Sequence, residues 1–214
     1  ENKRMIDKSC TEFAEMLASA APVPGGGGAS AMVGALGIAL GSMVCNLTLG
    51  KKKYENVQED IKVIIEKAEK LRKEFLTLVE KDAEVFEPLS KAYGMPRGTE
   101  EEKAEREQVM EKALKLACSA PIKIMEKCME AIALHEELAD KGTRIAISDV
   151  GVGVLLCKAA LKGASLNVFI NTKLMKDKEY ARNINESAIK MIEEGTRRAD
   201  KVCGNVEGQI YGGV

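Results

Sequence analysis

The chain has 214 residues, long enough to bury a sizeable core as one domain or as two small ones. Its 32 Lys and Arg residues balance 33 Asp and Glu residues, so a net charge of −1 gives no general attraction for nucleic acid. With 45% hydrophobic and 30% charged residues, the composition is typical of a soluble globular protein, and we expect a cytoplasmic one.

Histidine and cysteine offer little for metal or nucleophilic chemistry. The single histidine, His135, lies in the charged segment "ALHEELADK" and is expected to be solvated. A histidine-based zinc site or a Ser-His-Asp triad therefore has little to draw on. The six cysteines form no C-x-x-C pair, and several lie among apolar residues, which favours buried thiols in a reducing cytosol. We predict no metal site.

Apolar spacings of three and four residues predict helices along the whole chain, whereas no period-two pattern lasts long enough for a strand. Thr99 and Glu102 have the spacing of a capping box. The predicted helices cover about residues 11–20, 29–50, 55–92, 100–119, 121–142, 148–175 and 179–203. We therefore predict an all-α fold, a bundle of six to eight helices in a single domain over residues 1–214.

Residues 29–50 carry no charge and allow two interpretations. The stretch is long enough to cross a membrane, and the lysines that follow it could lie at a cytoplasmic edge. It is, however, rich in Gly, Ala and Ser and contains Asn46 and Thr48, and the other helices carry apolar stripes that need a partner. This favours a central, buried helix whose small residues let its neighbours approach closely, with no membrane partner.

Polar features lie at both ends of this stretch. Before it, four glycines (Gly25, Gly26, Gly27 and Gly28) form a predicted loop whose N–H groups would lie at the positive end of the helix dipole, which suits an anion or a polar heterocycle. The same four glycines could equally form a flexible connector with no ligand. After it, Lys51, Lys52 and Lys53 either cap the dipole or capture a carboxylate- or phosphate-bearing substrate.

Two carboxylates and two amides are further candidates for a site. Asp82 falls on the apolar stripe of its predicted helix, so it must be paired, hydrogen-bonded or directed into a cavity. Asp149 opens a low-charge helix and could simply stabilise its start. Asn167 and Asn171 are spaced i, i+4 and share a helical face, which suits either a polar heterocycle or a hydrogen-bonded pair between helices.

Together, five motifs resemble the formimidoyltetrahydrofolate cyclodeaminase / methenyltetrahydrofolate cyclohydrolase family over essentially the whole chain. They are "PGGGGAS", "NLTLGKKKY", "KDAEVF", "SDVGVG" and "LNVFIN". The family usually has three glycines followed by Ser, whereas here four glycines precede Ala29 and Ser30. The resemblance implies an all-helical homodimer that binds a tetrahydrofolate derivative in a cleft near the glycine loop and needs no cofactor beyond that substrate.

The resemblance also implies the chemistry. The activity we expect is that of a cyclodeaminase, which closes 5-formimidoyl-tetrahydrofolate to 5,10-methenyl-tetrahydrofolate with loss of ammonia. The alternative on the same scaffold is a cyclohydrolase, which hydrolyses that methenyl bridge to 10-formyl-tetrahydrofolate. Asp82 and Asp149 would share proton transfer and stabilisation of the cation, in an order left open. Asn167 and Asn171 would bind the pterin or the one-carbon unit. The three lysines would attract a glutamate tail, possibly polyglutamylated. The alternative of another class is a non-catalytic helical interaction or membrane module.

Overall fold

The computed structural model describes residues 4–212, and every regular element in that part of the chain is a helix, as predicted. The elements follow in the order η1 (Met5–Asp7), α1 (Cys10–Ala18), α2 (Gly26–Thr48), η2 (Lys52–Val57), α3 (Gln58–Tyr93), α4 (Glu100–Ala117), α5 (Ser119–Lys141), η3 (Arg144–Ala146), α6 (Ile147–Thr172) and α7 (Lys178–Tyr211), where η marks a short 3₁₀ helix.

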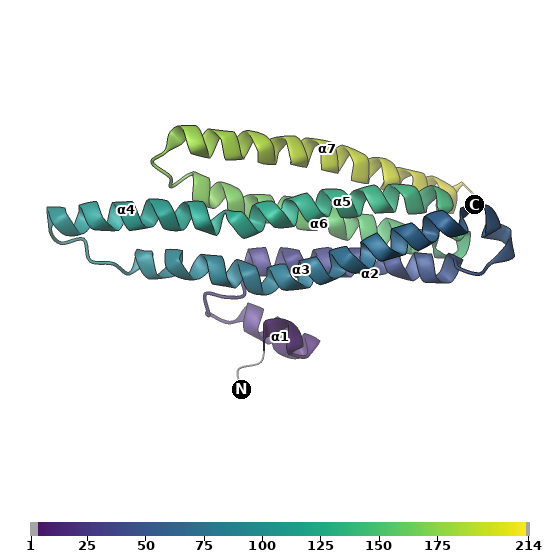
Figure 1. Cartoon of the computed structure of the whole chain (residues 1–214), viewed down its shortest axis with the longest axis horizontal. Helices are drawn as coiled ribbons and strands as arrows, with labels where there is room; N and C mark the ends of the chain where they lie inside the picture. Colours follow the sequence, from purple (N-terminus) through teal and green to yellow (C-terminus); the bar gives the residue numbers. More distant parts are fainter. Residues whose placement is uncertain (1–3, 213–214) are drawn as a thin grey trace.

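Four long helices, α2, α3, α5 and α6, surround one cluster of buried side chains, and α7 packs on α5 and α6. Figure 1 shows the long helices running along the length of the molecule, with α4 continuing in line into α5 and α1 lying outside the bundle. The apolar stripe predicted for residues 55–92 faces this core, since Ile61, Phe75 and Leu89 are fully buried. The predicted capping box at Thr99 and Glu102 starts α4.

The small residues of α2 allow its neighbours to approach closely. A Cβ atom at Gly34 would lie 2.5 Å from Phe75 Cε1 of α3, and one at Gly37 would lie 2.8 Å from Cys157 Sγ of α6. By length and composition α2 could cross a membrane, but 61% of its apolar window is buried inside the bundle. The bundle therefore covers most of α2, as it would a core helix, and leaves one apolar face exposed that includes Leu36 and Met43.

The expectation that His135 is solvated is wrong. Its ring is fully buried, and its Nε2 lies 2.9 Å from the Gly37 carbonyl oxygen, to which it donates as a neutral imidazole. The charged residues around His135 belong to the outer faces of α5, whereas His135 lies on the inner face and fills the space beside Gly41 and Gly153, which have no side chains. Burial lowers the pKa of His135 to about 4.

The glycine run is not a loop ahead of the helix, as the sequence suggested. Gly25 is the N-cap residue of α2, and Gly26, Gly27 and Gly28 form its first turn. Glycine is a poor residue for the interior of a helix, so its use here points to a steric requirement. That requirement is the close approach of other groups to this end of α2.

Candidate active site

The steric requirement at the start of α2 comes from Asp82 of α3. A Cβ atom on Gly27 would lie 2.3 Å from Asp82 Oδ1 and 2.4 Å from Oδ2, distances at which no side chain fits. Glycine at this position therefore lets a carboxylate lie directly against the helix terminus. The terminus carries unpaired N–H groups and the positive end of the helix dipole, both of which favour an anion.

Two opposing effects act on the Asp82 carboxyl group. Burial raises its pKa from the usual 3.8 to about 6, and a hydrogen bond from the Gly28 backbone N–H opposes that rise. Asp82 remains half-buried, so one side of the carboxylate still faces a cavity. A carboxyl group that titrates near neutrality and remains accessible is suited to general acid or general base catalysis.

The two predicted amides lie at the same place. Asn167 is half-buried, and its Nδ2 would lie 3.4 Å from a Cβ atom on Gly26; its side chain donates to the Gly163 carbonyl oxygen at 3.1 Å. Asn171, one turn later on α6, is buried and hydrogen-bonds the Cys118 thiol. The i, i+4 spacing places both amides on one face of α6, as predicted, and in the structure both line a pocket beside the start of α2.

These groups line one pocket of about 170 Å³ between the start of α2, the middle of α3, the α4–α5 junction and the end of α6. Its lining residues are Pro22, Val23, Gly25, Gly26, Gly27, Asp82, Phe86, Ala117, Pro121, Asn167, Ile170 and Asn171. We call it the Asp82 pocket. Its apolar walls could not be predicted from the sequence, although Phe86 belongs to the "KDAEVF" segment, because Ala117 and Pro121 come from helices distant in sequence.

The lysines and Asp149 lie at the opposite end of the molecule. The 23-residue helix α2 separates the glycines from Lys51, which at 1.5 Å per residue is about 34 Å. Asp149 lies half-buried in the first turn of α6, on the same continuous helix as Asn167 and about 27 Å from it along the axis. Within one chain, therefore, Asp82 and Asp149 cannot act on the same carbon atom.

This second end, the basic end, is held by a dense hydrogen-bond network. Lys51 Nζ donates to Thr143 Oγ1 at 3.2 Å, and the Thr143 backbone N–H donates to Thr48 Oγ1 at 2.9 Å. The Arg144 backbone N–H donates to the Tyr54 hydroxyl at 2.9 Å. Lys51 therefore differs from the other two lysines: it is pinned to the α5–α6 connection, whereas Lys52 and Lys53 are exposed. Tyr54 ends the quoted "NLTLGKKKY" segment, but its contacts could not be predicted from it.

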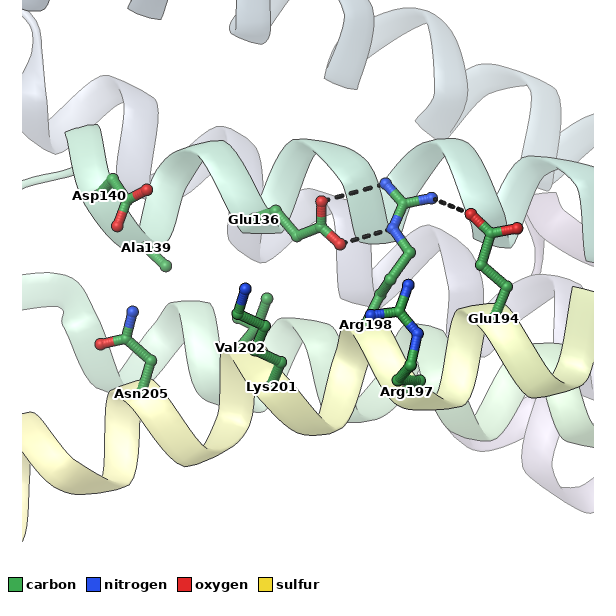
Figure 2. A pocket seen from close by; sticks show the side chains of 9 residues that line it. All are labelled: Glu136, Ala139, Asp140, Glu194, Arg197, Arg198, Lys201, Val202 and Asn205. Carbon is green, nitrogen blue, oxygen red and sulfur yellow. Dashed lines mark hydrogen bonds and ion pairs between the residues drawn. The ribbon is translucent and has the colours of Figure 1, made fainter.

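A larger groove, of about 420 Å³, lies between α5 and α7 and contains none of the predicted site residues. Figure 2 shows that opposite charges already meet within it: Arg198 makes two hydrogen bonds to Glu136, at 2.6 and 3.1 Å, and an ion pair with Glu194. Among residues 4–212 no group of three or more His, Cys, Asp and Glu side chains is arranged to hold a metal ion. The Asp82 pocket, by contrast, contains three of the four glycines together with Asp82, Asn167 and Asn171.

Comparison with known proteins shows the family to which the chain belongs. The family model described as formiminotransferase-cyclodeaminase matches residues 9–190, a range that includes Asp82, Asn167 and Asn171. The chain belongs to the formiminotransferase-cyclodeaminase family. The match spans the start of α2, the middle of α3 and all of α6, so every group of the Asp82 pocket lies inside it.

Individual members of the formiminotransferase-cyclodeaminase family carry two activities in their names. A methenyltetrahydrofolate cyclohydrolase of Methylorubrum extorquens is 46% identical over 181 residues, 85% of each chain. A formimidoyltransferase-cyclodeaminase of Mus musculus is 28% identical over 95% of this chain, which spans only 38% of that longer protein. A solved formiminotetrahydrofolate cyclodeaminase of Thermotoga maritima superimposes with a TM-score of 0.80 at 31% identity, covering 98% of each chain.

Proposed function

We propose that the protein is a soluble, cytoplasmic folate enzyme that hydrolyses the one-carbon bridge of 5,10-methenyl-tetrahydrofolate to 10-formyl-tetrahydrofolate. The observation that carries the proposal is the accessible Asp82 carboxyl group, whose pKa is raised to about 6 beside two amides. Hydrolysis needs a base to take a proton from the attacking water, and a carboxylate that titrates near neutral pH serves this purpose. The same carboxylate also stabilises the cationic bridge.

The residues around Asp82 would hold the ring that carries the bridge. Asn167 and Asn171 offer amide donors and acceptors to the polar edges of a pterin, while Phe86 and Ile170 supply apolar contacts to its faces. Water can add to an amidinium carbon without a metal ion or a redox cofactor, so the proposed reaction needs no cofactor besides its folate substrate. Treatment with EDTA should therefore leave the rate unchanged.

The choice of hydrolysis over deamination rests on the relative from Methylorubrum extorquens, which is 46% identical over 85% of both chains. The second candidate activity is the cyclodeamination of 5-formimidoyl-tetrahydrofolate, a lyase reaction favoured by the structural neighbour with a TM-score of 0.80. Both reactions pass through a tetrahedral carbon between two nitrogens, so the Asp82 pocket serves either one.

A spectroscopic assay distinguishes the two reactions. The purified protein is offered each folate in turn while the methenyl absorbance is followed. Hydrolase activity makes the absorbance of the methenyl substrate decay faster than the uncatalysed rate, whereas deaminase activity makes that absorbance appear from the formimidoyl substrate. A protein that does neither, while folded by circular dichroism, would contradict the proposed function.

We further propose that the enzyme works as a homodimer formed through α2 and α6. Both helices expose large apolar side chains, and Leu36 on α2 and Leu166 on α6 are 54% and 68% exposed. The other exposed apolar residues of this face are Met43, Leu47, Val152, Leu155 and Ile170. A second copy is the occupant that fits, because a two-fold axis across the middle of α2 would place the basic end of one copy beside the Asp82 pocket of the other.

This dimer would bring the basic end of one copy close to the Asp82 pocket of the other, although the two lie far apart within one chain. At about 170 Å³ the pocket is small for a whole folate, and we assign it the ring system. In the proposed dimer the partner's basic end extends that pocket, so the exposed Lys52 and Lys53 would attract the glutamate tail, and more strongly a polyglutamate. Raising the ionic strength should then weaken binding of a polyglutamyl folate more than that of a monoglutamyl folate.

A further inference from the structure

Tyr54 lies at the basic end in a chain of hydrogen bonds that the proposed reaction has not yet used. Its hydroxyl oxygen accepts the Arg144 backbone N–H at 2.9 Å and is also hydrogen-bonded by the Thr143 side chain. Thr143 in turn accepts from the Lys51 ammonium group at 3.2 Å. The Arg144 N–H uses one lone pair of the phenol oxygen and not its O–H proton, and the Thr143 hydroxyl is a second group that can donate to this oxygen when it is ionised.

The surroundings of Tyr54 favour loss of that proton. The two donors stabilise a phenolate, and the charged groups that act on the phenol are cationic: Lys53 on its own element and Arg144 on the α5–α6 connection. Lys53 Nζ lies 5.8 Å from the centre of the Tyr54 ring. These interactions lower the pKa of Tyr54 below its ordinary value of 10, chiefly through the Arg144 N–H.

The backbone around Tyr54 is fixed as a scaffold for this group. Gly50 turns the chain with a φ of 73°, and the Gln58 side chain donates to the carbonyl oxygens of Thr48 and Tyr54 at 3.2 and 2.9 Å. Gln58 also accepts the Gly50 N–H at 2.8 Å. The hydroxyl group of Tyr54, its carbonyl oxygen and the turn before it are all fixed by hydrogen bonds. This arrangement is typical of a preorganised functional group.

We propose that Tyr54 is the general acid of the folate reaction and acts in the Asp82 pocket of the partner copy. As the bond between the one-carbon unit and the leaving nitrogen breaks, its electron pair stays on nitrogen and the Tyr54 O–H proton moves to that nitrogen. The phenolate is then re-protonated from solvent. Asp82 takes one proton of the attacking water or, in deamination, the proton of N10, and then releases it to solvent. In hydrolysis the hydroxyl group left on the carbon gives its remaining proton to solvent as it becomes the formyl oxygen. The inference rests on the proposed function and dimer.

The first test replaces only the hydroxyl group. Tyr54→Phe should lower kcat by about a hundredfold with little change in KM, the usual contribution of a positioned acid. The alkaline limb of the pH–rate profile, measured after subtraction of the uncatalysed rate, should disappear. Thr143→Val, which removes one donor to the phenol, should move that limb to higher pH. The matched control is Tyr93→Phe, since Tyr93 is 47% exposed and lies on α3 outside the site.

A subunit-mixing experiment tests the placement across the two copies. Homodimers of Asp82→Asn and of Tyr54→Phe are mixed, unfolded and refolded together. If each site takes Asp82 from one copy and Tyr54 from the other, half of the dimers are mixed and each contains one intact site, so about a quarter of the wild-type activity returns. Without this arrangement, mixing restores nothing.

The outcomes separate this inference from the function it rests on. If the Tyr54→Phe variant has a kcat within threefold of wild type, or keeps the alkaline limb, the role of Tyr54 is overturned while the folate activity remains. Loss of activity without restoration on mixing, with both variants still dimeric, would overturn the placement in the partner's pocket. A folded wild-type protein that acts on neither folate would contradict the proposed function, and this inference with it.

Discussion

At the scale of single residues, the catalytic role proposed for Asp82 comes at a cost in stability. Its pKa is raised in the folded state to about 6 from 3.8, so its stabilising contribution is fully present below pH 3.8 and is lost as the pH rises through about 6. At pH 7 the ionised, half-buried carboxylate therefore destabilises the fold. Groups held in this way are typical of functional sites.

Replacement of Asp82 by asparagine should show both effects. Asp82→Asn should be more stable than wild type at pH 7.5, by about 1–2 kcal/mol once partial exposure is allowed for, and equally stable near pH 3.5. Urea unfolding at the two pH values measures the difference. A variant less stable than wild type at pH 7.5 would mean that Asp82 serves the fold and not the site.

Among the four glycines, Gly27 should be the least tolerant of substitution. Gly27→Ala places a Cβ atom 2.3 Å from Asp82 Oδ1, so the carboxylate must move away from the start of α2. We expect at least a tenfold loss of kcat/KM, about 1.4 kcal/mol. The control is Gly204→Ala on α7, where no atom lies within 4 Å of the new methyl group; its unfolding free energy should rise by up to about 1 kcal/mol with activity unchanged. Equal behaviour of the two variants would contradict the steric argument.

Residue chemistry was predictable from the sequence where it broke a local pattern. An aspartate on an apolar stripe and two amides at i, i+4 were conspicuous, and the structure brings all three to one pocket. His135 was misjudged because its charged neighbours in sequence lie on the outer faces of α5. Tyr54 could not be found, since its partners Thr143 and Arg144 come from a connection almost ninety positions away.

At the scale of elements, α2 meets α5 and α6 through His135. The ring occupies space left by glycines on both neighbouring helices, and its Nε2–H is bonded to the Gly37 carbonyl oxygen while its Nδ1 has no protein partner. Protonation would place a charge among buried groups with no acceptor for the second proton. The crossing of these helices is therefore sensitive to acid.

The acid sensitivity has a defined window. The pKa of His135 is lowered from 6.5 to about 4 in the folded state, so its contribution to stability is present above pH 6.5 and is lost as the pH falls toward 4. The loss amounts to about 3 kcal/mol at most. Urea unfolding of wild type and His135→Gln at pH 7.5 and 4.5 isolates it from the opposite effect of Asp82, which both proteins share. An identical pH dependence in the two proteins would contradict a neutral, buried His135.

The helices themselves were predicted well, because their apolar faces and capping residues are local signals. The segment expected at 55–92 is α3, Gln58–Tyr93, and the box at Thr99 opens α4. The start of α2 was placed too late, because a run of glycines normally interrupts a helix. Only the Asp82 carboxylate, which arrives from α3, explains why glycines occupy a helical turn.

At the scale of the whole molecule, the candidate residues form two groups at opposite ends of α2, and the proposed dimer would bring them together. The sequence already places the glycines and the lysines at the two ends of one predicted helix. It could not show that Asp82 lies with the glycines and Asp149 at the other end, because that depends on how α3 and α6 pack against α2. The exposed apolar face on these two helices is the feature from which the proposed dimer follows. Stable interfaces of this kind have an apolar centre that excludes water.

Disrupting that face should separate the subunits and abolish activity together. A charge at its centre, as in Leu155→Glu, should give monomers by analytical ultracentrifugation with native helicity, and the activity should fall by at least tenfold although Asp82 is untouched. Val63→Glu is the control, because Val63 is 50% exposed but lies on α3, away from this face. Monomers with full activity would mean that each chain holds a complete site.

The central claim is that Asp82 performs the proton transfer of a folate one-carbon reaction. The most direct measurement is the pH dependence of kcat/KM for hydrolysis of 5,10-methenyl-tetrahydrofolate by wild type and Asp82→Asn. We expect an acidic limb with an apparent pKa near 6 in wild type. In the variant we expect that limb to disappear and kcat/KM to fall by at least a hundredfold. A variant that retains more than a tenth of the activity, with the limb unchanged, would contradict it.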